Sequence, residues 1–263
     1  MTDFVNLGDA VNQFPTLTQS APHVSRSGRY HVISTAGVLQ SLEAEGFAIS
    51  AVTEMRTRKA DRVGFQKHLV RLRRFDAPTT GEGAPEVCLL NSHDGSAGWV
   101  LFAGFIRFAC ENGLIFGDAF LSQRVRHSGD IVGKVIDATY RVVNDFDTVA
   151  ASVDTMRSTL LTADDREEFA TRAHAIRYPD PDKAPVSPSA LLVPRRVSDV
   201  GADLWSTYNV VQENMLRGGA SQIGIGTNGR ARRRTMRRIT GIDANVSTNR
   251  ELHALASSYI RAA

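Results

Sequence analysis

Hydrophobic and polar residues alternate along three consecutive segments in the first half of the chain, 47–58, 65–74 and 86–91. Alternation with a period of two residues is typical of β-strands that bury one face. A fourth segment, 99–110, is apolar on both faces apart from Arg107, so it fits either a buried strand or a buried helix. Because short loops join the strands, the pattern predicts an antiparallel β-meander.

Apolar residues recur at helical spacing in the rest of the chain. The spacing predicts a helix over 35–45, several helices between 129 and 177, and further helices over 199–217 and 249–261. Thr162 precedes two acidic residues and is expected to cap one of these helices. The fold class is therefore expected to be α+β, with an antiparallel β-meander packed with helices and followed by a helical, basic C-terminal region.

Composition shifts along the chain predict four parts. The first 25 residues are polar and irregular, and four prolines fall within the twelve residues 178–189. We therefore expect a flexible N-terminal arm over 1–25, an α+β core with a helical extension over 26–177, a Pro-rich linker over 178–190 and a basic helical region over 191–263.

The composition of the chain excludes several classes of protein. With 42% hydrophobic and 22% charged residues, the 263-residue chain is typical of globular proteins and not of disordered or fibrous ones. No apolar run approaches the roughly 20 residues that span a bilayer, and the N-terminus does not resemble a signal peptide. Cys88 and Cys110 are too few for a disulfide scaffold and are expected in the core. These features favour a cytoplasmic protein without a membrane partner.

The basic residues are distributed unevenly along the chain, and most of them are arginine. Of 31 basic residues 27 are arginine, which either reflects codon bias or indicates contacts with phosphate. Residues 56–74 hold eight basic side chains against one acid, and residues 195–263 hold eleven arginines against five acids. Residues 145–183, in contrast, hold nine acids against five bases. Two separate basic segments are typical of a protein that binds a polyanion.

The basic segments supply the candidate nucleic-acid-binding residues. The polar side chains of the first two predicted strands are expected to form a groove for a nucleic-acid backbone, and the run that follows a glycine-rich loop is expected to form a second clamp. Trp99 or Tyr30 is a candidate for stacking on bases. The alternative for the basic run is a solvated face, or pairing with the acidic segment. The candidates are Arg56, Arg58, Lys67, Arg71, Arg73, Arg230, Arg232, Arg233, Arg234, Arg237 and Arg238.

Two further motifs could carry other chemistry. Residues 224–229 match GxGxxG, but no strand of a βαβ unit precedes them in the predicted pattern, so a flexible loop is favoured over a dinucleotide site. No cofactor is expected. His93 and Asp94, with His68 on a neighbouring strand, could hold a divalent metal for hydrolysis. The alternative is a structural turn, since Asn, Asp and Gly favour turns.

Longer strings in the chain resemble a known family. RYHVISTAGVLQSLEAEGF, GFQKHLVRLRR, PEVCLLNSHDGSAGWVLFAGFIRFACENGLIFG and LLVPRRVSDVGADLWSTYNVVQENMLRGG are similar to the DUF932 family of phage and plasmid proteins. The resemblance covers most of residues 29–260. It departs from the family near the C-terminus, where His253 stands in the place of a tryptophan. The resemblance implies a mobile-element context and no particular activity.

The predicted element order also resembles the core of Rad52-type single-strand annealing proteins. This likeness is one of architecture, without a shared catalytic motif. It implies a protein without enzymatic activity that binds single-stranded DNA independently of sequence and anneals it in recombination, as a homo-oligomeric ring or filament. The alternatives are a metal-dependent nuclease or phosphodiesterase that uses His68, His93 and Asp94, and a regulatory protein-interaction module.

Overall fold

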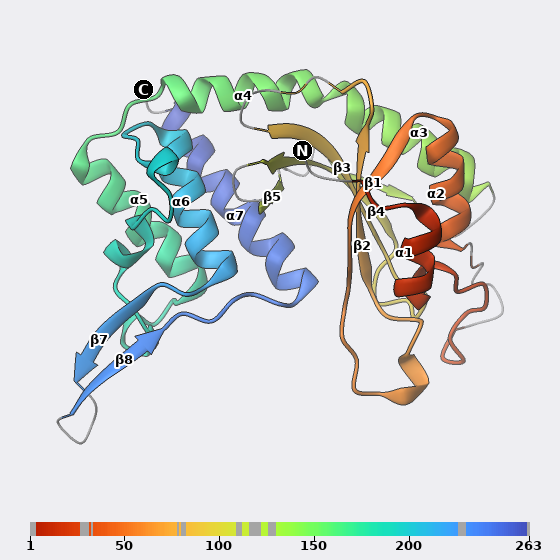
Figure 1. The fold of residues 1–263 in the computed structure, drawn as a ribbon, viewed down its shortest axis with the longest axis horizontal. Coiled ribbons are helices and arrows are strands. Elements are labelled where there is room, and N and C mark those ends of the chain that lie inside the picture. The colour runs from red at the N-terminus through yellow and green to blue at the C-terminus, as the bar shows by residue number, and fades with distance from the viewer. Residues whose placement is uncertain are drawn as a thin grey trace. The chain divides into compact units, whose positions relative to one another are not determined.

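A computed structural model describes residues 4–26, 32, 34–77, 79, 83–108, 112–115, 122–125, 130–225 and 230–261. The chain divides into two compact units, Met1–Val149 and Ala150–Ala263. The division falls inside helix α4, Phe146–Ser158. The mixed α+β class expected from the sequence is confirmed (Figure 1).

The first unit contains an antiparallel sheet in which neighbouring strands follow the order β1-β2-β3-β4-β5. The predicted meander is confirmed, and segment 99–110 contributes a strand and not a helix. β4 pairs with β5 through Gly104–Arg107 and with β6 through Trp99–Phe102, so these two short strands share one side of β4. The strands are β1 Phe47–Glu54, β2 His68–Arg74, β3 Gly83–Asn91, β4 Trp99–Arg107, β5 Asn112–Ile115 and β6 Ser122–Val125.

A bulge interrupts the first strand. Ile49 pairs with Leu72 and Ala51 pairs with Arg71, so Ser50 is the additional residue in β1. The strand ends at Glu54, four residues before the predicted end. Arg56 and Arg58 therefore lie in the loop between β1 and β2, and not on the sheet.

Helices cover the sheet and build the core of the first unit. Helices α2, Thr35–Ala44, and α3, Ile131–Asn144, contact each other, and they contact β1 and β4 respectively. The apolar stripe of α2 is fully buried at Val38, Leu39 and Leu42. Burial of such a stripe supplies most of the stability of a short helix.

The N-terminal segment is packed, contrary to the flexible arm expected over 1–25. Residues 7–13 form helix α1, Leu7–Gln13, and a 3-10 turn follows over Pro15–Leu17. Ala10 and Leu17 are fully buried, and the Val5 N–H donates to the Ile49 carbonyl at 2.8 Å. Pro15 begins the 3-10 turn because its φ angle is already fixed near the value that such a turn requires.

The second unit is mainly helical. Its helices are α5, Ala163–Arg177, α6, Leu204–Arg217, and α7, Ile242–Arg261, and they contact one another. Thr162 caps α5 as predicted, and Asp165 completes the capping box.

The proline-rich segment 178–190 is part of the second unit and not a linker between domains. It forms 3-10 turns over Pro181–Lys183 and Pro188–Leu192, and the second turn packs against α5. Val186 is buried, and its carbonyl lies 2.9 Å from the His174 Nε2. The prolines therefore shape a packed connection, so the expected boundaries at 177 and 190 are not those of the structure.

The basic C-terminal region contains a hairpin besides its helices. Strands β7, Ser221–Ile225, and β8, Ala231–Thr235, pair with each other as a separate two-stranded sheet. In Figure 1 the hairpin extends away from the helices of its own unit. In the part of the chain that the structure describes, none of the helices is both long and apolar enough to cross a membrane.

Candidate nucleic-acid interface

The basic residues predicted to form a groove divide into an exposed group and a buried group. Arg56 and Arg58 are exposed in the loop after β1. Lys67 and Arg73 are each only 7% exposed, and the Arg71 side chain is only 11% exposed. The expectation that all five line an open groove is therefore wrong for Lys67, Arg71 and Arg73.

Arg71 is a structural ion-pair partner. Its Nη1 lies 2.9 Å from the carboxylate of Glu86 on β3, and that carboxylate is fully buried. The Ser50 hydroxyl at the bulge donates to the other Glu86 oxygen at 2.6 Å. Both carboxylate oxygens thus have partners, which a buried charge requires.

Arg73 is held by aromatic rings. The centre of its guanidinium lies 4.6 Å from the ring centroid of Phe4 and 5.8 Å from that of Phe108. Both distances fall within the range of a cation–π contact. The side chain therefore joins the N-terminal segment to the sheet.

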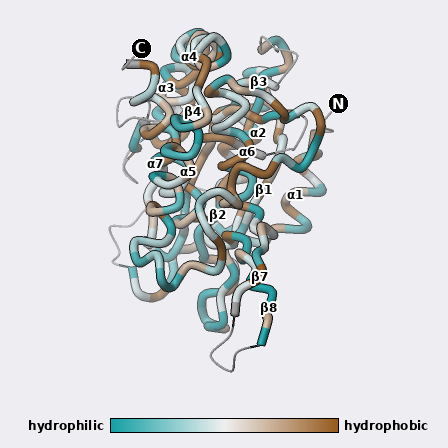
Figure 2. Tube along the Cα trace, turned by 90° about the vertical axis from the view of Figure 1, so that its left-hand side faces the viewer, coloured by the Kyte–Doolittle hydropathy of each residue, from teal (hydrophilic) through white to brown (hydrophobic). Residues whose placement is uncertain are grey.

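The second basic run lies on the exposed hairpin. Every residue of β8 is exposed, and Figure 2 shows this strand as hydrophilic. Within the described residues, no carboxylate pairs with the side chains of five of the predicted arginines. These are Arg232, Arg233, Arg234, Arg237 and Arg238. Arg230, the sixth predicted residue of this run, is also exposed.

The hairpin distributes its arginines over two faces. Arg232 pairs with Gly224 and Arg234 with Gln222, whereas Arg233 pairs with Ile223 on the opposite face. A Cβ atom on Gly224 would lie 3.7 Å from the Arg234 Nε, so the Arg234 side chain extends over this glycine. Ile223 is 70% exposed, which leaves an apolar side chain beside Arg233.

The base of the hairpin is anchored to the end of α6. Met236, directly after β8, is 1% exposed, and its carbonyl accepts a hydrogen bond from the Gly219 N–H at 2.8 Å. Arg195 donates to the Gly218 carbonyl, and Arg177 donates to the Met215 carbonyl. Cations at the C-terminal end of a helix satisfy its last carbonyls and its dipole. The arginines of the anchor are therefore structural, in contrast to those of β8.

The two candidate metal-ligating histidines are buried and form contacts within the protein. His68 and His93 stack with their ring centroids 5.5 Å apart. The His68 Nε2 lies 2.8 Å from the Thr35 hydroxyl, and the His93 Nε2 lies 2.9 Å from the Thr16 carbonyl. Burial, together with the charge of His93, lowers the pKa of His68 to about 3. These contacts tie α2 to the start of β2, and the N-terminal segment to the turn after β3.

Asp94 lies in the turn after β3. Its carboxylate accepts a hydrogen bond from the Ser96 N–H at 2.9 Å and lies 3.3 Å from the Arg62 guanidinium. Burial alone raises the pKa of Asp94, but hydrogen bonds from Ser96 and Ser92 and the charge of Arg62 lower it overall. Among residues 4–261, outside the undescribed gaps, no three His, Cys, Asp or Glu side chains are grouped so that they could hold a metal ion.

Of the remaining sequence candidates, Trp99 is fully buried and is therefore not available to stack on bases. Tyr30 and Cys110 lie outside the described residues, as do residues 226–229 of the GxGxxG match. Gly224, the first glycine of that match, lies in β7. Cys88 is buried in β3, as expected, and burial raises the pKa of its thiol to about 11.

Comparisons with known proteins match most of the chain. The model of the family described as "Domain of unknown function (DUF932)" matches residues 22–253. Two proteins of Escherichia coli (strain K12), UPF0380 protein YafZ and UPF0380 protein YfjQ, are each 39% identical over 246 residues, which cover 94% of this chain and 88% of each relative. No solved structure matches the chain. The extent of the family match and the identity to these relatives show that the chain belongs to the DUF932 family.

Proposed function

We propose that the protein binds single-stranded DNA through its phosphate backbone, independently of sequence, and anneals complementary strands as a homo-oligomer. The observation that carries this proposal is the hairpin β7–β8, on which Arg232, Arg233 and Arg234 are exposed and lack a carboxylate partner within the described residues. Like charges so close together repel each other, and a bound polyanion would relieve that repulsion.

The chemistry of the hairpin supports phosphate as the ligand. Guanidinium groups form bidentate hydrogen bonds with phosphate oxygens. Alternate residues of a strand lie roughly 6.6–6.8 Å apart, so Arg232 and Arg234 are spaced like successive phosphates of an extended strand. The exposed loop residues Arg56 and Arg58 would add further phosphate contacts.

Annealing and oligomer formation have a different basis. The order of elements in the first unit, a helix, an antiparallel meander and then helix α3, resembles that of Rad52-type annealing proteins. This support is an analogy of fold. The same proposal includes that the oligomers are rings or filaments, that the protein originates from a phage or plasmid, and that it acts in the cytoplasm.

The test for binding is fluorescence anisotropy with a labelled single-stranded oligonucleotide at several salt concentrations. We expect the affinity to fall steeply with salt, because each neutralised phosphate releases counterions. The variant Arg232→Gln/Arg233→Gln/Arg234→Gln should bind more weakly and lower the salt slope by about 0.7 for each lost contact. The matched control changes three exposed arginines outside both basic segments, Arg141→Gln/Arg157→Gln/Arg172→Gln, and should bind as the wild type does.

Annealing needs its own measurement. Complementary strands that carry a fluorophore and a quencher should pair faster with the protein, and negative-stain images should show rings or filaments. Binding without faster pairing would leave a single-strand binding protein and refute annealing. No binding, or binding that is indifferent to salt and to the hairpin variant, would refute the whole proposal.

A further inference from the structure

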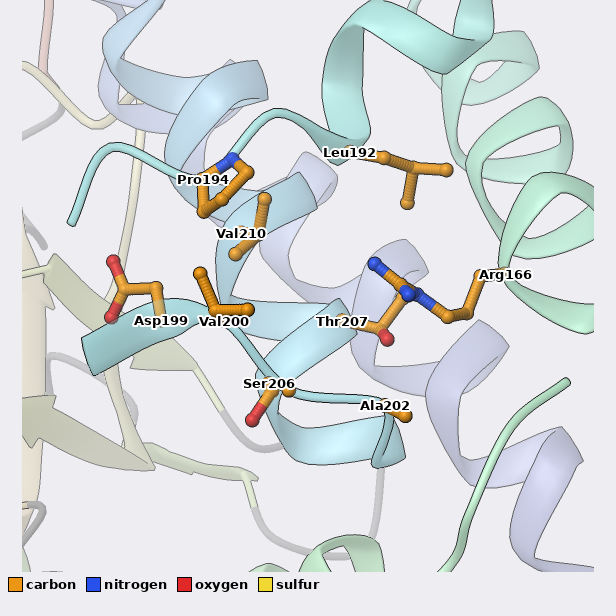
Figure 3. A pocket seen from close by; sticks show the side chains of 10 residues that line it. Arg166, Leu192, Pro194, Asp199, Val200, Ala202, Ser206, Thr207 and Val210 are labelled. Carbon is orange, nitrogen blue, oxygen red and sulfur yellow. The ribbon is translucent and has the colours of Figure 1, made fainter. Parts of the chain in front are cut away.

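A cavity of about 350 Å³ lies within the second unit (Figure 3). Its walls come from α5, from the segment between α5 and α6, and from the first two turns of α6. The volume is at the lower end of the range for small-molecule sites. The cavity is therefore large enough for a small ligand.

The walls are mainly apolar. Leu192, Pro194, Val200, Ala202 and Val210 line the cavity, and in Figure 3 their side chains surround its centre. Val200 is also 71% exposed, so apolar surface continues from the cavity to the outside of the protein. A ligand with an apolar body would bury this surface favourably.

The smaller polar side chains of the walls already have partners within the protein. The Ser206 hydroxyl donates to the Asp203 carboxylate at 2.7 Å, and the Thr207 hydroxyl donates to the Asp203 carbonyl at 3.0 Å. The Asp199 carboxylate lies 3.2 Å from the Arg196 Nε, and Figure 3 shows it at the opposite end of the cavity from Arg166. Arg196 is therefore an ion-pair partner of Asp199, and the same guanidinium also pairs with Glu213.

Arg166 differs from these side chains because it extends into the cavity from α5 (Figure 3). Its Nε is buried, and no hydrogen-bond partner for it occurs in the described parts of the chain. A buried N–H donor without a partner is costly, and an acceptor such as an anion or a water molecule in the cavity would satisfy it.

We infer that this cavity binds a small amphiphilic anion, whose carboxylate or phosphate monoester pairs with Arg166 while its apolar tail lies between Val200 and Val210. The inference does not depend on the proposed nucleic-acid function. The cavity contacts the first turns of α6, whereas the basic hairpin follows the last turn of that helix.

The test is isothermal titration of the full chain, in a chloride-based buffer, with octanoate, octyl phosphate and the uncharged analogue 1-octanol. At least one of the anions should bind at least about tenfold more tightly than 1-octanol, since a charge-assisted hydrogen bond contributes that much to affinity. The tighter of the two anions then shows whether the cavity prefers a carboxylate or a phosphate monoester.

Variants test the role of Arg166. Arg166→Gln should bind the anions and 1-octanol with similar affinities, whereas Arg166→Lys should retain a preference for the anions. The matched control is Arg172→Gln, which changes an exposed arginine of the same helix and should bind as the wild type does. The thermal midpoint of each variant shows whether it is folded.

A second pair of variants does not alter the arginine. Val200→Glu places a carboxylate at the exposed edge of the cavity and should weaken binding of the anions, whereas Val200→Lys should not. Equal affinity of the wild type for all three compounds would overturn the inference. Retention of the anion preference in folded Arg166→Gln, or no binding of either anion up to millimolar concentration, would overturn it as well.

Discussion

The guanidinium of Arg71 lies 2.9 Å from the carboxylate of Glu86, in the interior of the protein. The two side chains come from neighbouring strands, and Cys88 pairs directly with Arg71 in the register of those strands. A charge this deeply buried is stable only with its partner, because water no longer solvates it.

Arg71→Ala should lower the free energy of unfolding by about 3–5 kcal/mol, because it leaves the Glu86 carboxylate buried and unpaired. Urea denaturation followed by circular dichroism measures this change. Arg56→Ala, at an exposed position, should change the free energy by no more than about 0.5 kcal/mol.

A double variant separates the charge from the packing. Arg71→Met/Glu86→Leu removes both charges and should recover most of the stability that Arg71→Ala loses. If Arg71→Ala alone were as stable as the wild type, Glu86 would not depend on this arginine.

The stability of the first unit should depend on pH through His68. Its pKa is about 3 in the folded protein, against an ordinary value of 6.5, so the unfolded chain binds more protons between these values. The free energy of unfolding is therefore not reduced by this titration above pH 6.5. It decreases by about 1.4 kcal/mol per pH unit as the pH falls from 6.5 towards 3. Urea denaturation of the wild type and of His68→Gln between pH 4 and 8 measures the difference.

His68→Gln should show a shallower loss of stability below pH 6.5, whereas above pH 7 the two proteins should depend on pH in parallel. Identical slopes between pH 4 and 6 would contradict the assignment of this titration to His68.

Two adjacent glycines at the base of the hairpin should differ in their tolerance of a side chain. Both have positive φ angles, +67° at Gly218 and +89° at Gly219. A Cβ at Gly218 would lie 2.5 Å from the backbone of Arg237, whereas a Cβ at Gly219 would meet only the end of the Arg195 side chain, at 3.6 Å. We expect Gly219→Ala to cost about 1 kcal/mol, from the strained φ angle alone.

Gly218→Ala should cost roughly 2 kcal/mol more, because the backbone of the hairpin must move away. It should also increase cleavage of the hairpin by trypsin, since the arginines of β8 would lose their fixed position. Equal stability of the two variants would mean that the backbone can adjust freely at this site.

Cys88 should not react with thiol reagents in the folded protein. Burial raises the pKa of its thiol to about 11, so the reactive thiolate is scarce and inaccessible. In the Cys110→Ser variant, a chromogenic disulfide reagent at pH 8 should detect no thiol under native conditions and one thiol in urea. Rapid reaction of the native variant would show that β3 opens easily.

The helices and the meander could be predicted because each has a clear period in the sequence. Alternation shows which residues of a strand share a face, but it does not show whether solvent or protein covers that face. Arg71 and Arg73 alternate with Val70 and Leu72 as expected, yet both faces of β2 are largely buried. The acidic Glu86, in an otherwise apolar strand, was the signal that a basic partner lies nearby.

The hairpin was missed for a different reason. Its strands are short, and one consists mostly of arginine, which has little preference for strands. The Asn228–Gly229 step between the two strands is a frequent hairpin signal in sequences and could have indicated it. The cavity beside Arg166 could not be predicted, because its residues are brought together only by the packing of α5 and α6.

The bridge between Val5 and Ile49 has a consequence for solubility. Among the strands that the structure describes, β1 is the last on its side of the sheet, and the exposed backbone of such a strand can recruit another chain. Val5 occupies part of that edge next to the Ser50 bulge, and the bulge itself disturbs the regular ladder. Val5 therefore covers part of this edge, and we expect a chain that lacked residues 4–17 to expose the edge to other chains and to aggregate more readily.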